Sequence, residues 1–368
     1  MHKIREFCRR ECVLTVTALL TVISLFFIPP DRQYLAYIDF RVIGLLFCLM
    51  AVVAALQQEN VFRIMACRLL SYTDNCRKLF FILTLICFFS SMLITNDVAL
   101  LTFVPLTITL FDSIKEEKLI FIIVMETAAA NLGSLLTPIG NPQNLYLFSR
   151  YHFTLGQFFT VTMPLGAFCL ALILLFLWRF AAPGQISQKP RKNPERSKGR
   201  LCLYASLFVI CILSVLNMIP VWLCALVVIA SIGLTDRKAL AYVDYGLLLT
   251  FIAFFIFVGN LSRWPAFSQF LQSALAGREM LISALTSQLI SNVPAVMLLS
   301  PFTEDARHLL LGVNIGGMGT LVASLASLIS YKLYSRRRQA KSGKYLLEFS
   351  AVNFSILVIL LLFGYYLY

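Results

Sequence analysis

The sequence predicts an all-α membrane protein made of two inverted repeats, with about nine transmembrane helices plus two re-entrant hairpins. The first observation is composition: 59% of the residues are hydrophobic and 13% are charged, whereas a soluble domain is about 45–50% apolar. The second is a series of apolar segments of membrane-spanning length, which is about 20 residues. The third is similarity between the two halves of the chain. Together they place most of the chain in lipid.

Nine apolar segments suit crossings of the membrane. They are 12–28, 38–56, 119–135, 157–178, 201–217, 220–234, 243–259, 308–331 and 346–366. Residues 79–111 and 280–302 differ, because polar residues interrupt the middle of each. Their arms are about 11 to 17 residues long, which is short for a full crossing at about 1.5 Å per residue. Both are therefore expected to be re-entrant hairpins buried within the protein.

Basic residues predict the orientation. With the N-terminus in the cytoplasm, 25 of the 31 Lys and Arg fall in cytoplasmic segments, as the positive-inside rule requires. A full crossing by 79–111 would move the basic loops 179–200 and 332–344 to the other side. We therefore expect a multi-pass inner-membrane protein with a cytoplasmic N-terminus and an external C-terminus. These loops also explain the net charge of +13 without nucleic-acid binding.

Three blocks of the first half reappear in order in the second half. DRQYLAYID (31–39) matches DRKALAYVD (236–244), SSMLITNDVALLTFVP (90–105) matches TSQLISNVPAVMLLSP (286–301), and NLGSLLT (131–137) matches NIGGMGT (314–320). An odd number of crossings separates the copies, so their orientations are opposite. Inverted repeats with interrupted helices are typical of secondary transporters.

The expected organisation follows these blocks. It comprises a first inverted repeat at 1–182 with hairpin 79–111 and broken helix 119–150, a basic cytoplasmic linker at 183–200, and a second inverted repeat at 201–368 with hairpin 280–302 and broken helix 308–331.

The interruptions predict the solute site. Hairpin tips and broken helices leave backbone N–H groups unpaired and direct positive helix N-termini inward, which suits anionic or polar solute groups. The predicted substrate-binding residues are Thr95, Asn96, Ser291, Asn292 and Thr320.

A second set is predicted to bind the coupling cation. Asp97 and Glu126 are acids within apolar segments, where a carboxylate is costly unless it faces a cavity or a partner. For Glu126, a place near the headgroups or a pair with an Arg stays open. The break TPIGNPQN (137–144) frees carbonyls and carries amide side chains, so Thr137, Asn141 and Asn144 complete the set. A Na⁺ site is the one metal site expected, because the Cys are scattered without a CxxC and the three His are far apart in sequence.

At these residues the chain resembles the ion-transporter superfamily of citrate and dicarboxylate carriers, sodium/proton antiporters and arsenite pumps. The similar segments are LLFCLMAVVAALQQENVF, LITNDVALLTFVPLTI, NLGSLLTPIGNPQN and LISNVPAVMLL, and the first hairpin is most similar to the arsenite-type branch. The resemblance implies that Asn96, Ser291 and Asn292 bind substrate and that Thr137, Asn141 and Asn144 hold the cation. It also implies a homodimer. The second break departs from the family pattern, because it lacks a Pro-rich segment.

The leading functional prediction is a secondary transporter that couples Na⁺ or H⁺ to an inorganic or carboxylate anion by alternating access. Its partners would be a small anionic or polar solute and the lipid bilayer, with no cofactor beyond the coupling ion and no nucleic acid. A sodium/proton antiporter that titrates Asp97 and Glu126 is the alternative. An intramembrane lipid-phosphate enzyme is remote, because the second hairpin tip has neither the acids nor the Arg that this chemistry needs.

Overall fold

The computed structural model describes residues 12–31, 33–61, 63–64, 68, 75–111, 115–181 and 198–367. Within this part the protein is helical, which confirms the all-α class. The basic N-terminal residues and residues 183–197 of the predicted linker lie outside it. Five described helices are long and apolar enough to span a membrane: α4 (Phe40–Gln58), α6 (Cys76–Ile94), α10 (Leu155–Phe180), α14 (Tyr245–Ser262) and α20 (Ser342–Leu367).

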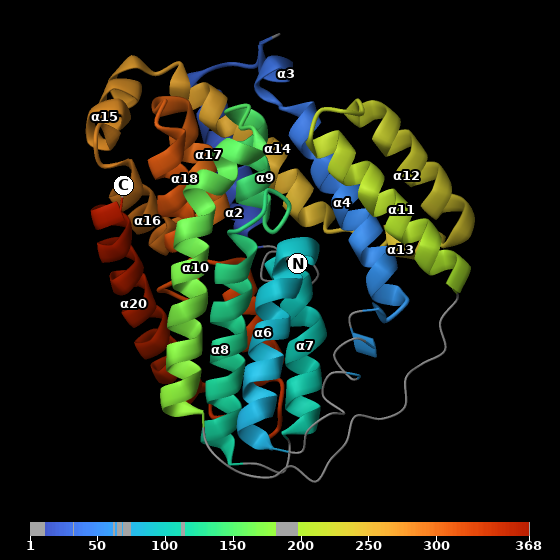
Figure 1. Ribbon diagram of the computed structural model, residues 1–368. Coiled ribbons are helices and arrows are strands. Elements are labelled where there is room, and N and C mark those ends of the chain that lie inside the picture. The colour runs from blue at the N-terminus through green and yellow to red at the C-terminus, as the bar shows by residue number, and fades with distance from the viewer. Residues whose placement is uncertain are drawn as a thin grey trace.

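One group of helices joins both halves of the chain (Figure 1). It contains α4 and α14 together with α2 (Cys12–Phe27), α3 (Tyr34–Tyr37), α11 (Lys198–Val215), α12 (Val221–Thr235) and α13 (Arg237–Leu240). Helix α2 of the first half of the chain packs on α14 of the second half, and α12 of the second half packs on α4 of the first half. The two central helices begin alike, because Asp39 caps α4 through the N–H of Val42 (3.0 Å) and Asp244 caps α14 through the N–H of Leu247 (2.8 Å).

The second group holds the hairpins and the broken helices. It contains α6, α10 and α20 together with α7 (Asn96–Leu110), α8 (Glu116–Ser134), α9 (Pro142–Arg150), α15 (Pro265–Leu275), α16 (Glu279–Ile290), α17 (Asn292–Leu299), the 3₁₀ turn η1 (Ser300–Phe302), α18 (Ala306–Ile315) and α19 (Leu325–Ser335). Helix α8 contacts α6, α7, α10, α19 and α20, so its second half is buried on every side.

Both interrupted segments turn back on themselves. The first turns at Thr95, and the rings of Phe80 and Phe111 at its two ends are 5.2 Å apart. The second turns at Ser291. At the other end of this hairpin, where its two arms begin and end, Thr303 Oγ1 donates to Glu279 Oε1 (3.2 Å). One expectation needs correction: α6 has 19 residues and is itself long enough to span a membrane. It starts early because the side chain of Asn75 caps its first turn.

A glycine allows each broken helix to approach its hairpin. A Cβ on Gly133 of α8 would lie 2.1 Å from the carbonyl oxygen of Phe88, and a Cβ on Gly316, directly after α18, would lie 2.8 Å from Cα of Ala284. Neither separation can accommodate a methyl group. Each broken helix therefore packs backbone to backbone against one hairpin arm.

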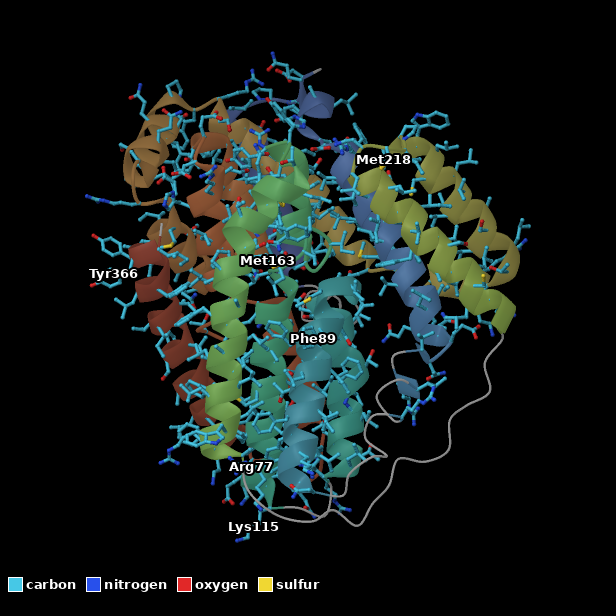
Figure 2. The ribbon with its side chains drawn as sticks, viewed as in Figure 1. Arg77, Phe89, Lys115, Met163, Met218 and Tyr366 are labelled. Carbon is cyan, nitrogen blue, oxygen red and sulfur yellow. The ribbon has the colours of Figure 1, made fainter. Side chains whose placement is uncertain are left out.

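Figure 2 places Arg77 and Lys115, which flank the first hairpin, at the same end of the molecule. Near this end Glu116 accepts from Arg337 (2.7 Å), and Lys344 donates to Glu117 (2.8 Å). The Lys344 ammonium holds the pKa of the exposed Glu117 carboxyl below its usual value. These contacts join α8 to the segment that follows α19 and to the first turn of α20.

Candidate functional site

The two hairpin tips have the same strained backbone. Thr95 has φ 67° and ψ 150°, and Ser291 has φ 74° and ψ 154°. These values are rare outside glycine and cost about 1–3 kcal/mol each, and such strain clusters at functional sites. The next residue in each case is an Asn only 4% exposed. Asn96 Oδ1 accepts from the N–H of Asp97 (3.1 Å), and Asn292 Oδ1 accepts from the N–H of Val293 (2.9 Å).

Each tip is bonded to the break of its own half. The N–H of Asn96 donates to the carbonyl of Gly140 (3.2 Å), and the N–H of Asn292 donates to the carbonyl of Ala323 (2.9 Å). Thr137 and Thr320, at matching positions of the breaks, then donate their hydroxyls to hairpin carbonyls, those of Met92 (2.5 Å) and Gln288 (3.0 Å). Thr137 and Thr320 thus fasten the hairpins rather than leaving their hydroxyls free.

Two further asparagines join the breaks of the two halves. Asn131, in the last turn of α8, accepts from Ser324 Oγ (3.0 Å) and donates to Ser327 Oγ (3.2 Å) in the second break and α19. Its Oδ1 also accepts from Asn96 Nδ2 (3.0 Å), which connects the first tip to the same cluster.

Asn314 makes the reciprocal contacts. It lies near the end of α18, accepts from Asn141 Nδ2 (3.2 Å) and donates to Asn144 Oδ1 (2.7 Å). The predicted site list omits Asn131 and Asn314, although the alignment of NLGSLLT with NIGGMGT pairs them. The pairing of these two asparagines in the repeated block could have predicted that both belong to the site.

Polar side chains line a cavity of about 150 Å³ beside the first tip. They are Gln57, Thr95, Asp97, Asn141, Tyr242 and Asp244, and the other lining residues are apolar. No hydrogen bond or ion pair from the described residues reaches the carboxylate of Asp97, whose electrostatic neighbour is Asp244 at the start of α14. No Lys or Arg is among the lining residues.

The predicted residues therefore fall into three places. Thr95, Asp97 and Asn141 share the cavity, whereas Ser291, Asn292 and Thr320 surround the second tip and do not line it. Asn96, Thr137 and Asn144 are not among the lining residues and make hydrogen bonds within the first tip and the first break. Sequence reasoning missed Asp244, although it ends the block DRKALAYVD and aligns with the acid Asp39 of the first half.

Glu126 lies elsewhere, which separates it from Asp97. Its side chain is fully buried, its Oε1 accepts from the hydroxyl of Thr107, and its Oε2 has no partner among the described residues. It does not line the cavity. Among the described residues, its hydrogen-bond partner is thus Thr107 of α7 and not an Arg.

Among the described residues, no three His, Cys, Asp or Glu side chains are grouped as a metal site would require. Cys211 and Cys224, predicted to be isolated, do approach each other (Sγ–Sγ 3.9 Å) inside the first helix group. Both thiols are buried, and neither cysteine lines the cavity that contains Asp97 and Asp244. Oxygen and amide groups are thus the chemistry that the site offers.

Comparison with known proteins shows the family. The family model described as "Citrate transporter" matches residues 7–310. The chain belongs to the citrate transporter family. Its membership confirms the resemblance to the ion-transporter superfamily and assigns the chain to transporters, not enzymes.

Individual relatives agree with this family. Inner membrane protein YbiR of Escherichia coli is 32% identical over 320 residues, 85% of each chain. Uncharacterized transporter MJ0456 of Methanocaldococcus jannaschii is 32% identical over 336 residues, 89% of this chain and 90% of its own. Putative transporter arsB of Dictyostelium discoideum is 29% identical over 164 residues, 43% of this chain and 28% of its own. This citrate transporter family member is therefore a multi-pass integral membrane protein that transports a small solute.

Proposed function

We propose that the chain is a secondary active transporter that couples the movement of H⁺ or Na⁺ to that of a small inorganic or carboxylate anion by alternating access. The observation that carries the proposal is the pair of strained hairpin tips, each bonded to a broken helix by equivalent contacts, with Asp97 of the first tip facing a cavity. The family description, citrate transporter, supports a carboxylate as the first candidate solute.

Electrostatics supplies a reason for coupling. Two carboxylates, Asp97 and Asp244, line the cavity without a basic residue among the described lining. An anion that entered would be repelled, and the repulsion between unit charges grows as the local dielectric constant falls. A cation or proton that neutralises Asp97 lowers this barrier, because one of the two carboxylates no longer repels the anion. Binding of the cation therefore precedes or accompanies binding of the anion.

The anion itself would bind at the tips. Helices α7 and α17 both begin directly after a tip, so their positive dipole ends point toward it. In this proposal Thr95 and Asn96 contribute one half of the solute site and Ser291 and Asn292 contribute the other, while Thr320 supports the second tip through its bond to the carbonyl of Gln288. The bonds of Asn131 and Asn314 to the opposite break would keep the two halves in register.

Alternating access follows from the proposed architecture. Two inverted repeats, 1–182 and 201–368, can exchange equivalent conformations and so open the site to either side in turn. In this proposal the N-terminus and the linker 183–200 face the cytoplasm and the C-terminus faces outside. A homodimer stays a prediction.

Purified protein in proteoliposomes tests the proposal. Uptake of labelled citrate, other carboxylates and oxyanions is measured under an imposed pH or sodium gradient and with no gradient. We expect accumulation of at least one anion only when a gradient is present. If the anion only reached equal concentrations inside and outside, with or without a gradient, the protein would be a passive channel instead.

A sodium/proton antiporter remains the second candidate. The observation that favours it is the cavity with two carboxylates and no Lys or Arg in its described lining. An antiporter would move radioactive sodium in response to a pH gradient with no anion present. The leading proposal predicts no such movement.

A further inference from the structure

The short helices α3 and α13 are repeat counterparts, and each packs on the central helix of the other half: α3 on α14, and α13 on α4. The central helices begin at the equivalent caps Asp39 and Asp244 and continue without a break. The pairing of DRQYLAYID with DRKALAYVD therefore extends along both helices, and Phe62 and Phe267 keep the same spacing beyond them. The contacts of the two halves can thus be compared position by position.

The contact between α3 and α14 is closed. The ring of Tyr37, the last residue of α3, lies so close to Gly259 that a Cβ there would be 2.4 Å from the ring carbon Cγ. Arg263, directly after α14, donates from Nη1 to the hydroxyl of Tyr37 (3.2 Å) and to Asp31 Oδ2 (2.7 Å). A tyrosine ring thus packs on the helix, and an arginine holds its hydroxyl.

The equivalent contact between α13 and α4 is open. In the alignment of the two halves, the counterparts of Tyr37, Gly259 and Arg263 are Tyr242, Ala54 and Gln58. Tyr242 is 72% exposed, and the buried Nε2 of Gln58 has no hydrogen-bond partner among the described residues. Tyr242 and Ala54 both line the cavity of about 150 Å³. The cavity thus lies between groups whose counterparts are in contact in the other half.

The hairpins differ in the same sense. Helix α17, the second arm of the second hairpin, packs on α14. Its counterpart α7 faces α4 across the cavity, which Val53 of α4 and Val98 and Leu101 of α7 line. A single printed hydrogen bond, from Gln57 Nε2 to Thr102 Oγ1 (3.4 Å), joins these two helices in the described part of the chain. One half is therefore closed on its central helix, whereas the other is open.

Two inverted repeats that exchange conformations also exchange such contacts. We propose that Tyr242 is the gate of the cavity on the side that the proposed orientation places in the cytoplasm. In the opposite state its ring packs on Ala54, and its hydroxyl accepts from Gln58 Nε2, which satisfies a buried donor that is costly to leave unpaired. The contact of Tyr37 with α14 opens in exchange. This inference rests on the alternating access proposed above and assigns residues to it.

The gate is looser than its counterpart. Gly259 leaves room for the ring of Tyr37, whereas the methyl group of Ala54 keeps the ring of Tyr242 further from the helix. This difference favours the state of the structure, in which the cavity is open at Tyr242. Removing one methyl group at Ala54, or adding one at Gly259, should therefore shift the equilibrium toward the opposite state.

The experiment measures from which side the cavity can be reached. In a variant without the ten native cysteines, Val98→Cys places a thiol in the lining. Its rate of labelling by a membrane-impermeant maleimide is measured in inside-out and right-side-out vesicles. Ala54→Gly lets the ring of Tyr242 approach, and Gly259→Ala displaces the ring of Tyr37. We expect each substitution to slow labelling from the cytoplasmic side several-fold and to speed labelling from the outside.

Gly233→Ala in α12 is the matched control, because a Cβ there would meet no atom within 4 Å. It should leave labelling from both sides unchanged. Adding Tyr242→Ala to Ala54→Gly removes the ring, so labelling from the cytoplasmic side should return at least to the rate of Val98→Cys alone. If Gly259→Ala does not fold, Ala54→Gly alone decides the result. Unchanged labelling in Ala54→Gly would overturn the inference, and so would a shift that persists without the ring of Tyr242.

The labelling needs no transported solute, so its result is independent of the uptake experiment. Failure of every anion to accumulate would refute the proposed function, whereas a shift of labelling that depends on Tyr242 would still establish the gate. Accumulation of an anion together with unchanged labelling in Ala54→Gly would retain the function and refute the gate.

Discussion

At the scale of single residues, Asn96 is the most connected side chain of the first tip. Its backbone N–H reaches Gly140, its Nδ2 reaches Asn131, and its Oδ1 caps the N–H of Asp97. Asn292 repeats the first and third of these contacts at the second tip. Both side chains therefore hold the backbone of the tips, where we propose that the solute binds.

Asn96→Ala and Asn292→Ala should each reduce gradient-driven uptake at least about tenfold, because an unsatisfied buried polar group costs about 1–3 kcal/mol and the tip shifts. Membrane insertion, followed by the yield of folded protein in detergent, should be preserved. Asn353→Ala, which removes a buried amide away from the tips, should retain uptake. Wild-type uptake in both tip variants would remove the tips from the mechanism.

Asp97→Asn should abolish the response of uptake to a pH gradient, because the amide cannot bind and release the proton. Asp244→Asn should also weaken the response of uptake to a pH gradient, but by less. The variant should fold, since Asn still caps α14. Uptake is measured at several external pH values. Asp39→Asn makes the same change at the equivalent cap of α4, outside the cavity, and should leave the pH profile unchanged. Equal profiles in all three variants would rule out coupling at the cavity.

At the scale of elements, the structure depends on close contact between α8 and α6. Gly133→Ala would place a methyl group 2.1 Å from the carbonyl of Phe88. Overpacking of this kind costs about 1–3 kcal/mol, so Tm should fall by several degrees and uptake should fall with it. Gly156→Ala is the control in α10, where a Cβ meets no atom within 4 Å. A wild-type Tm for Gly133→Ala would mean that this packing is not close.

Much of this local structure could be predicted from sequence. The tips and breaks could be predicted because matching positions of the repeated blocks carry the same residue type: Asn96 matches Asn292, and Thr137 matches Thr320. A polar residue type that recurs at an interruption indicates that the local backbone needs its hydrogen bonds. The length of α6 could not be found this way. Its start depends on the Asn75 cap, which the hydropathy of the segment does not reveal.

The partners of the acids were beyond sequence reasoning. Glu126 precedes Asn131 by five residues, which at 3.6 residues per turn puts it about 140° around α8. It therefore faces Thr107 of α7 while Asn131 faces the breaks. Asp244 reaches the cavity, and the Gln288 side chain reaches the carbonyl of Gly316, only through tertiary contacts between segments far apart in sequence. Composition and periodicity carry no signal for such contacts.

At the scale of the whole molecule, the two helix groups meet where α9 touches α4 and where α17 touches α14. The cavity lies on this boundary, since its lining comes from α4 and α14 on one side and from the first tip and break on the other. Relative movement of the two groups would therefore change access to Asp97. Exposed apolar side chains such as Phe89 and Met163 mark the surface that lipid covers (Figure 2).

The most direct test concerns the path of the first hairpin through the membrane. In a variant without the ten native cysteines, Lys78→Cys and Lys115→Cys are labelled one at a time with a membrane-impermeant maleimide in right-side-out and inside-out vesicles. Lys78 and Lys115 flank the two arms of the hairpin, so we expect both positions to be labelled only from the cytoplasmic side. Labelling of the two positions from opposite sides would show that 79–111 crosses the membrane once, and would contradict the proposed site.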